Sequence, residues 1–137
     1  MKRVAAPLLL IAALLTVAVA GYWFKRPENS QAVACVDPLA GCSFNHRGTP
    51  VKVVFSAQPT PLESFELRIG APGVRKISAE FQMNGMEMGF NRYDLRPTEN
   101  GRLAAKVTLP VCVSGRHDWT LFLDLDGTRY ALPFSTH

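Results

Sequence analysis

The sequence predicts an all-β domain preceded by one N-terminal membrane helix, and three observations support this prediction. A 20-residue run without charge extends from Ala5 to Phe24. After residue 50, apolar and polar residues alternate with a period of two, as in half-buried strands. Two dipeptides, Asn84-Gly85 and Asp126-Gly127, supply the positive φ angles of two-residue hairpin turns. We expect an antiparallel immunoglobulin-like β-sandwich of about seven strands, with a small barrel as the alternative.

The apolar run and its basic start, residues 1–24, fit an uncleaved signal anchor, because about 20 apolar residues cross a bilayer core. Tyr22 and Trp23 lie where an interfacial aromatic belt is expected, with basic residues beyond them. The alternative is a signal peptide that is cut near Ala20. Both interpretations export the same domain. We expect a single-pass inner-membrane protein with its C-terminal domain in the periplasm.

Residues 25–50 are expected to form a linker and an irregular segment, because Pro and Gly are frequent and periodic apolar positions are few. Thiols outside the cytoplasm are oxidised where geometry allows, so Cys35 and Cys42 are the expected disulfide pair. Cys112 is either a small buried hydrophobe or a thiol that binds a soft metal or pairs with one of the other two. The β-domain then spans residues 51–137.

The clearest strands of this domain are 51–55, 65–69 and 103–109, where apolar and polar residues alternate. A two-residue turn at Asp126-Gly127 sets large apolar residues opposite each other at three positions on one face. The facing pairs are Leu123 with Tyr130, Leu121 with Leu132, and Trp119 with Phe134.

A second hairpin is predicted at Asn84-Gly85 by the same construction. Its facing pairs are Met83 with Met86, Phe81 with Met88, and Ala79 with Phe90. All methionines of the chain except the initiator then lie on one face at the tip of this hairpin.

The methionines Met83, Met86 and Met88 are the one chemical cluster that the sequence offers. Thioether sulfur is soft and neutral, so two or three such groups favour Cu(I) over Zn, Mg or Ca. His117, in a loop, and Cys112 are candidate additional ligands. The structural alternative is that the methionines cap the core and contact aromatic rings.

The Met-Asn-Gly-Met-Glu-Met-Gly hairpin at 83–89 and the Ser-Gly-Arg-His-Asp-Trp turn at 114–119, behind a membrane segment, resemble the FixH and YtkA-like families. The resemblance concerns the organisation of residues 50–134. It implies a small membrane-anchored periplasmic immunoglobulin-like domain that handles copper in cytochrome oxidase assembly. The chain departs from these families in its three cysteines and in lacking a His-Met pattern beside the hairpin.

Other function classes find little support. The chain has 137 residues, and outside the leader thirteen basic residues face eleven acidic ones without a basic run, so we expect no nucleic-acid partner. Ser114, His117 and Asp118 contain the residue types of a hydrolase triad, but no nucleophile elbow is present, and we expect no enzyme. The sequence predicts a copper(I)-binding or copper-delivery accessory protein for a respiratory oxidase. The alternative is a structural or interaction module that docks another envelope protein through a strand edge or the hairpin tip.

Overall fold

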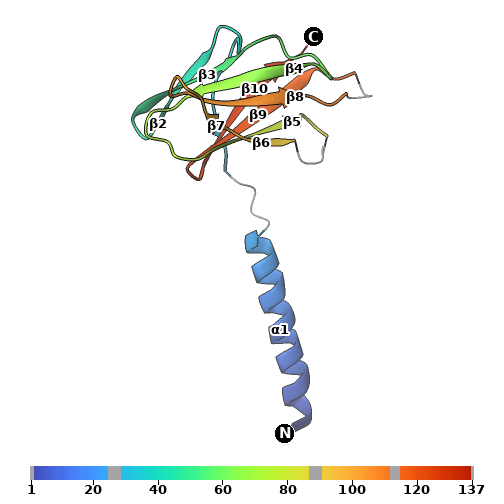
Figure 1. The fold of residues 1–137 in the computed structure, drawn as a ribbon. Helices are drawn as coiled ribbons and strands as arrows, with labels where there is room; N and C mark the ends of the chain where they lie inside the picture. Colours follow the sequence, from blue (N-terminus) through green and yellow to red (C-terminus); the bar gives the residue numbers. More distant parts are fainter. Residues whose placement is uncertain (1, 25–28, 87–90, 112–114, 137) are drawn as a thin grey trace.

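A computed structural model of the protein describes residues 2–24, 29–86, 91–111 and 115–136. One apolar helix, α1 (Lys2–Phe24), precedes a domain of two five-stranded sheets (Figure 1). The window from Pro7 to Phe24 has a mean hydropathy of 2.1, and none of it is buried by the rest of the chain. Its length and composition fit a membrane anchor or a signal sequence. The predicted N-terminal helix and mainly antiparallel β-domain are confirmed.

The first sheet has the strand order β1-β10-β9-β5-β6. Its strands are β1 (Gln31–Ala32), β5 (Ile77–Met83), β6 (Arg92–Asp94), β9 (Asp118–Leu125) and β10 (Thr128–Ser135). All pairs are antiparallel except β1 with β10, which run parallel. Because β1 pairs with Tyr130 and Ala131, the chain enters the sheet near the turn that joins β9 to β10.

The second sheet is fully antiparallel, with the order β2-β3-β4-β8-β7. Its strands are β2 (Cys42–His46), β3 (Thr49–Phe55), β4 (Ser64–Gly70), β7 (Arg96–Pro97) and β8 (Leu103–Thr108). The segment expected to be irregular thus contains both β1 and β2. β2 was not predicted because its buried positions are Cys42 and His46 and not the branched aliphatic residues that are typical of strands.

The two sheets share one hydrophobic core. Aromatic rings from the second sheet, Phe55 and Phe65, meet Phe81 and Phe134 of the first sheet with ring centroids 5.3 to 6.4 Å apart. These separations lie in the range that favours edge-to-face and tilted contacts between rings. The inner faces of the two sheets therefore pack against each other.

The predicted β9–β10 hairpin is confirmed in turn and in register. Asp126 and Gly127 have φ angles of 46° and 87°, as a primed two-residue turn requires. The large apolar pairs of the prediction face each other across the ladder, including Trp119 with Phe134.

The second predicted hairpin closes as expected but has a different register. The Met86 N–H donates to the Met83 carbonyl at 3.3 Å, so the turn is formed. The ladder between β5 and β6, however, pairs Ala79 with Tyr93, three residues beyond the predicted partner Phe90. The predicted register of this hairpin is therefore wrong, whereas Met88 and Phe90 themselves lie outside the described residues.

Candidate binding site

The two described methionines of the β5–β6 turn differ in burial. Met83 is 3% exposed and belongs to the core, because it continues the inward face of β5. Met86, beyond the turn, is 37% exposed. Two further candidate ligands, Met88 and Cys112, lie outside the described residues. An ion bound at the surface of this turn would therefore meet Met86 and not Met83.

His117 lies in the segment that leads into β9, beside the same turn. The Asn84 N–H donates to the Asp118 carbonyl at 3.1 Å, which joins the turn to this segment. The carbonyl of His117 accepts from the Thr136 N–H at 2.9 Å, and its side chain is exposed. In the described ranges, no three His, Cys, Asp or Glu side chains are grouped as metal ligands.

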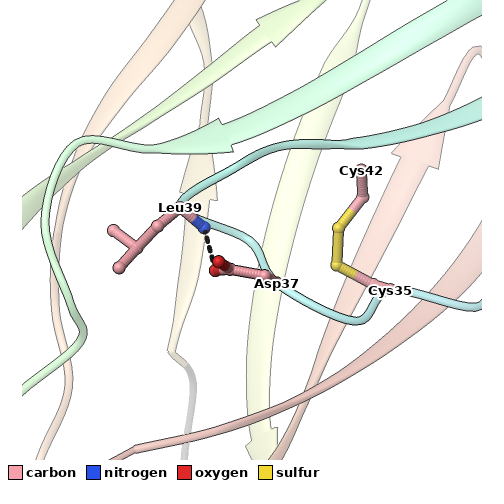
Figure 2. The surroundings of a disulfide bond; sticks show 4 residues. All are labelled: Cys35, Asp37, Leu39 and Cys42. Carbon is pink, nitrogen blue, oxygen red and sulfur yellow. Dashed lines mark hydrogen bonds between the residues drawn. A yellow bond between two sulfur atoms is a disulfide. The ribbon is translucent and has the colours of Figure 1, made fainter.

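The predicted disulfide between Cys35 and Cys42 is confirmed and closes a short loop (Figure 2). Inside the loop, Asp37 Oδ1 accepts from the Leu39 N–H at 2.8 Å. The Phe55 N–H donates to the Pro38 carbonyl at 3.0 Å. The loop is thereby fixed against the end of β3.

A cavity of about 620 Å³ lies between the disulfide loop and the first sheet. Its described walls are the loop residues 35–39, the end of β10 at 133–135, and Asp118 and Trp119 at the start of β9. Gln58 and Asn84, from two further loops far apart in the sequence, complete the described lining, so no local pattern predicted the cavity.

The cavity carries negative charge, and one of its lining residues is a buried tryptophan. Asp37 and Asp118 are the ionisable side chains among its described lining residues, and Asp118 also pairs with Arg116 at 3.3 Å. Trp119 is 1% exposed, and its Nε1–H has no hydrogen-bond partner in the described part of the chain. Buried donors are rarely left unpaired, because desolvation without a partner is unfavourable. A ligand that supplies a cation would complement the negative charge of this site.

The loops at this end of the domain, which we call the loop end, carry exposed apolar side chains. It comprises the described loops 35–41, 56–63, 84–86, 109–111 and 115–117. The Leu62 N–H donates to the Leu109 carbonyl at 2.9 Å, which joins two of these loops. The exposed apolar residues are Val36, Leu39, Leu62, Met86 and Val111. One such residue is ordinary on a protein surface, but five of them on loops at one end, with Val36 and Leu39 in the cavity lining, are typical of a binding surface.

Comparison of the chain with protein-family models, with curated proteins and with solved structures finds no match. The resemblance to the FixH and YtkA-like families stays a prediction. The chemistry of the loop end therefore has to support any functional proposal.

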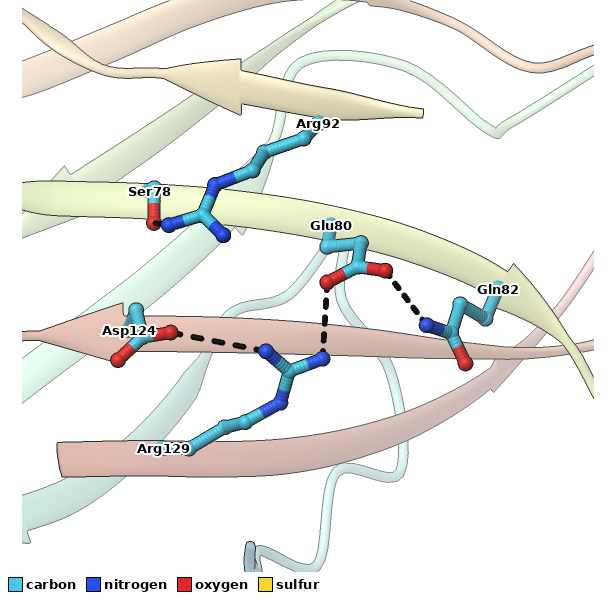
Figure 3. A network of polar contacts seen from close by, with 6 residues as sticks. All are labelled: Ser78, Glu80, Gln82, Arg92, Asp124 and Arg129. Atoms are coloured by element: carbon cyan, nitrogen blue, oxygen red, sulfur yellow. Dashed lines mark hydrogen bonds and ion pairs between the residues drawn. The ribbon is translucent and has the colours of Figure 1, made fainter. Parts of the chain in front are cut away.

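The outer face of the first sheet carries a polar network whose members bind one another (Figure 3). Arg129 Nη2 lies 2.8 Å from Glu80 Oε2, Arg129 Nη1 lies 3.6 Å from Asp124 Oδ2, and the guanidinium lies 4.6 Å from the centroid of the Phe122 ring. Burial raises the pKa of Glu80, but hydrogen bonds from Gln82 and Arg129 and the nearby positive charges outweigh it and hold this pKa below its usual value. The network is internally paired, and we assign it to stability.

Proposed function

We propose that the protein is a non-enzymatic interaction module of the cell envelope that binds a partner protein at its loop end. The exposed apolar residues on the loops at this end, two of which line the cavity, carry this proposal. The chain enters through β1 near the start of β10, whereas the cavity lies at the end of β10. The loop end is thus at the opposite end of the sheet from the connection to α1.

For the compartment, we propose that α1 is a signal anchor in the inner membrane and that the domain lies in the periplasm. The apolar side chains of α1 from Pro7 onward are exposed, including Tyr22 and Trp23 near its end. Disulfides such as Cys35–Cys42 persist in oxidising compartments, which supports export.

We further propose that the domain is immunoglobulin-like. That fold has strands A, B, E and D in one sheet and G, F, C and C′ in the other. We letter the strands from β3 to β10, in chain order, A, B, C, C′, D, E, F and G. The orders β3-β4-β8-β7 and β10-β9-β5-β6 then agree with this connectivity. The strands β1 and β2 are then additions at the start of the domain.

Site-specific photo-crosslinking in native membranes tests the loop-end proposal. A crosslinking residue at Val36 or at Leu62 should give an adduct of the same mass. The control position is Arg75, which is exposed at the other end of the domain, where its N–H donates to Asp126. Introducing Met86→Asp should reduce the adduct formed at Val36. An equal adduct at Arg75, or none at Val36 and Leu62, would contradict the proposal.

Copper(I) binding is the second candidate function, supported by the hydrogen bond between the Asn84 N–H and the Asp118 carbonyl. This bond brings the turn that carries Met86 beside the segment that carries His117. Titration with Cu(I) under reducing conditions should show weaker binding in Met86→Ala, Met88→Ala and His117→Ala than in the parent. Met83→Leu, which replaces a buried side chain, is the matched control and should bind like the parent. Equally weak binding by all forms would exclude this candidate.

A further inference from the structure

The edge of β10 carries backbone groups that point away from β9. The Thr136 N–H donates to the His117 carbonyl at 2.9 Å, so these two residues form a hydrogen-bonded pair of the antiparallel ladder. Hydrogen-bonded and non-hydrogen-bonded pairs alternate along such a ladder. Pro133 and Ser135 therefore direct their backbone groups toward the opposite side. Ala131 follows the same alternation, since its carbonyl accepts from the Val33 N–H at 2.9 Å.

This edge is covered only at its start. β1 pairs with Tyr130 and Ala131, and no described strand pairs with β10 on that side beyond them. The Pro133 carbonyl and the Ser135 N–H and carbonyl therefore have no described strand partner on this side. Both residues line the cavity. Unpaired groups at a sheet edge are a template for an additional strand.

The other walls indicate the chemistry of that strand. Asp37 forms no ion pair in the described part of the chain, and no basic side chain is among the described lining residues. A cationic side chain would complement Asp37 and would compete with Arg116 for Asp118, whereas an acidic one would meet like charges.

We propose that the cavity receives an extended segment of the partner, which pairs with the edge of β10 beyond Ala131 and directs a Lys or Arg side chain at Asp37 and Asp118. This inference rests on the proposed loop-end binding and names the partner's contacting element. The backbone pairing supplies affinity, and the two carboxylates select the cationic side chain.

Fluorescence of Trp119 in the full chain tests the proposal. Trp23→Phe, in detergent micelles, leaves Trp119 as the single tryptophan. The probes are three acetylated and amidated pentapeptides, Thr-Val-Lys-Val-Thr and its counterparts with Ala or Glu at the centre. The Lys peptide should change the emission saturably at or below about 1 mM. The Ala peptide should bind about tenfold more weakly and the Glu peptide more weakly still, because each lacks the charge-assisted contact.

Matched variants separate charge from backbone pairing. Asp37→Asn should weaken binding of the Lys peptide about tenfold and leave binding of the Ala peptide unchanged. Glu63→Gln, in a neighbouring loop outside the cavity lining, should change the affinity for neither peptide. Ser135→Pro removes the edge N–H and should weaken all peptides about tenfold. Ser135→Ala keeps that N–H and should bind all three peptides more tightly than Ser135→Pro.

Equal affinity for the three peptides, unchanged binding in Ser135→Pro, or no emission change with any peptide would overturn the proposal. The crosslinking experiment distinguishes this failure from a failure of the proposed function. If the Val36 adduct forms but the peptides do not bind as expected, the extended segment is not the occupant of the cavity, and the proposed interaction module is unaffected. If both fail, the loop end is not the binding surface.

Discussion

Met83 lies directly opposite Trp119 across β5 and β9, and both side chains are almost fully buried. Met83, which the sequence analysis placed in a candidate metal-binding cluster, is therefore a core residue at the end of β5. Met86, three positions later, is an exposed residue of the same turn. The two methionines should consequently respond in opposite ways to tests of stability and of binding.

Replacing Met83 by Ala should lower the free energy of unfolding by about 2 to 5 kcal/mol, because it leaves a cavity in a packed core. Met83→Leu nearly conserves volume and should lower it by less than about 1.5 kcal/mol. Met86→Ala, at an exposed position, should change it by less than about 0.5 kcal/mol. Urea denaturation followed by circular dichroism measures all three. Equal losses in Met83→Ala and Met86→Ala would contradict the burial difference.

Local patterns predicted those parts of the fold that depend on local chemistry. The β9–β10 hairpin was predicted in full, because Asp126-Gly127 sets its turn and the alternation of large apolar residues sets its register. The Cys35–Cys42 disulfide was predicted because the two thiols are close in the sequence.

Long-range packing decided the parts that could not be predicted. Tyr93 sets the β5–β6 register, because its ring packs on Phe81 and its hydroxyl donates to the Thr108 carbonyl in the other sheet at 3.0 Å. No alternation within the hairpin contains this information. The cavity was missed for the same reason, since its walls come from five separate segments, with Trp119 expected only as a core residue.

The buried pair of His46 and Tyr130 should make a measurable contribution to stability. His46 is 3% exposed, and its Nδ1 lies 2.9 Å from the Tyr130 hydroxyl. Tyr130→Phe leaves the imidazole nitrogen without this partner, so the free energy of unfolding should fall by about 1 to 3 kcal/mol. The double variant His46→Phe/Tyr130→Phe removes both polar groups and should be less destabilised than the sum of the single variants. Additive losses in this cycle would argue against the coupling.

Stability should depend on pH through Glu80. Its folded-state pKa is lowered, so the carboxylate contributes stability above its ordinary pKa of 4.5 that is lost as the pH falls through the lowered value. Glu80→Gln should lower the free energy of unfolding by about 1 kcal/mol at pH 7 and by less at pH values near 3. Arg129→Gln should reduce the pH dependence in the same range. Urea titrations at both pH values measure it, and a difference that stays constant or grows in acid would refute this role.

The Cys35–Cys42 disulfide should stabilise both the domain and the cavity wall that carries Asp37. The two cysteines are 7 residues apart, and for so short a loop the chain-entropy model gives about 2.5 kcal/mol. Cys35→Ala/Cys42→Ala should lose about this much stability and should bind the Lys peptide more weakly, because Asp37 is no longer held beside β10. The reduced parent separates loss of the bond from truncation of the buried Cys42 side chain and should show the same weakened binding.

Alkylation without reductant, followed by mass analysis, should label Cys112 alone, and three labelled thiols or a bridge to Cys112 would contradict the pairing. If the reduced parent retained full affinity for the Lys peptide, the loop would be a structural clamp without influence on the cavity.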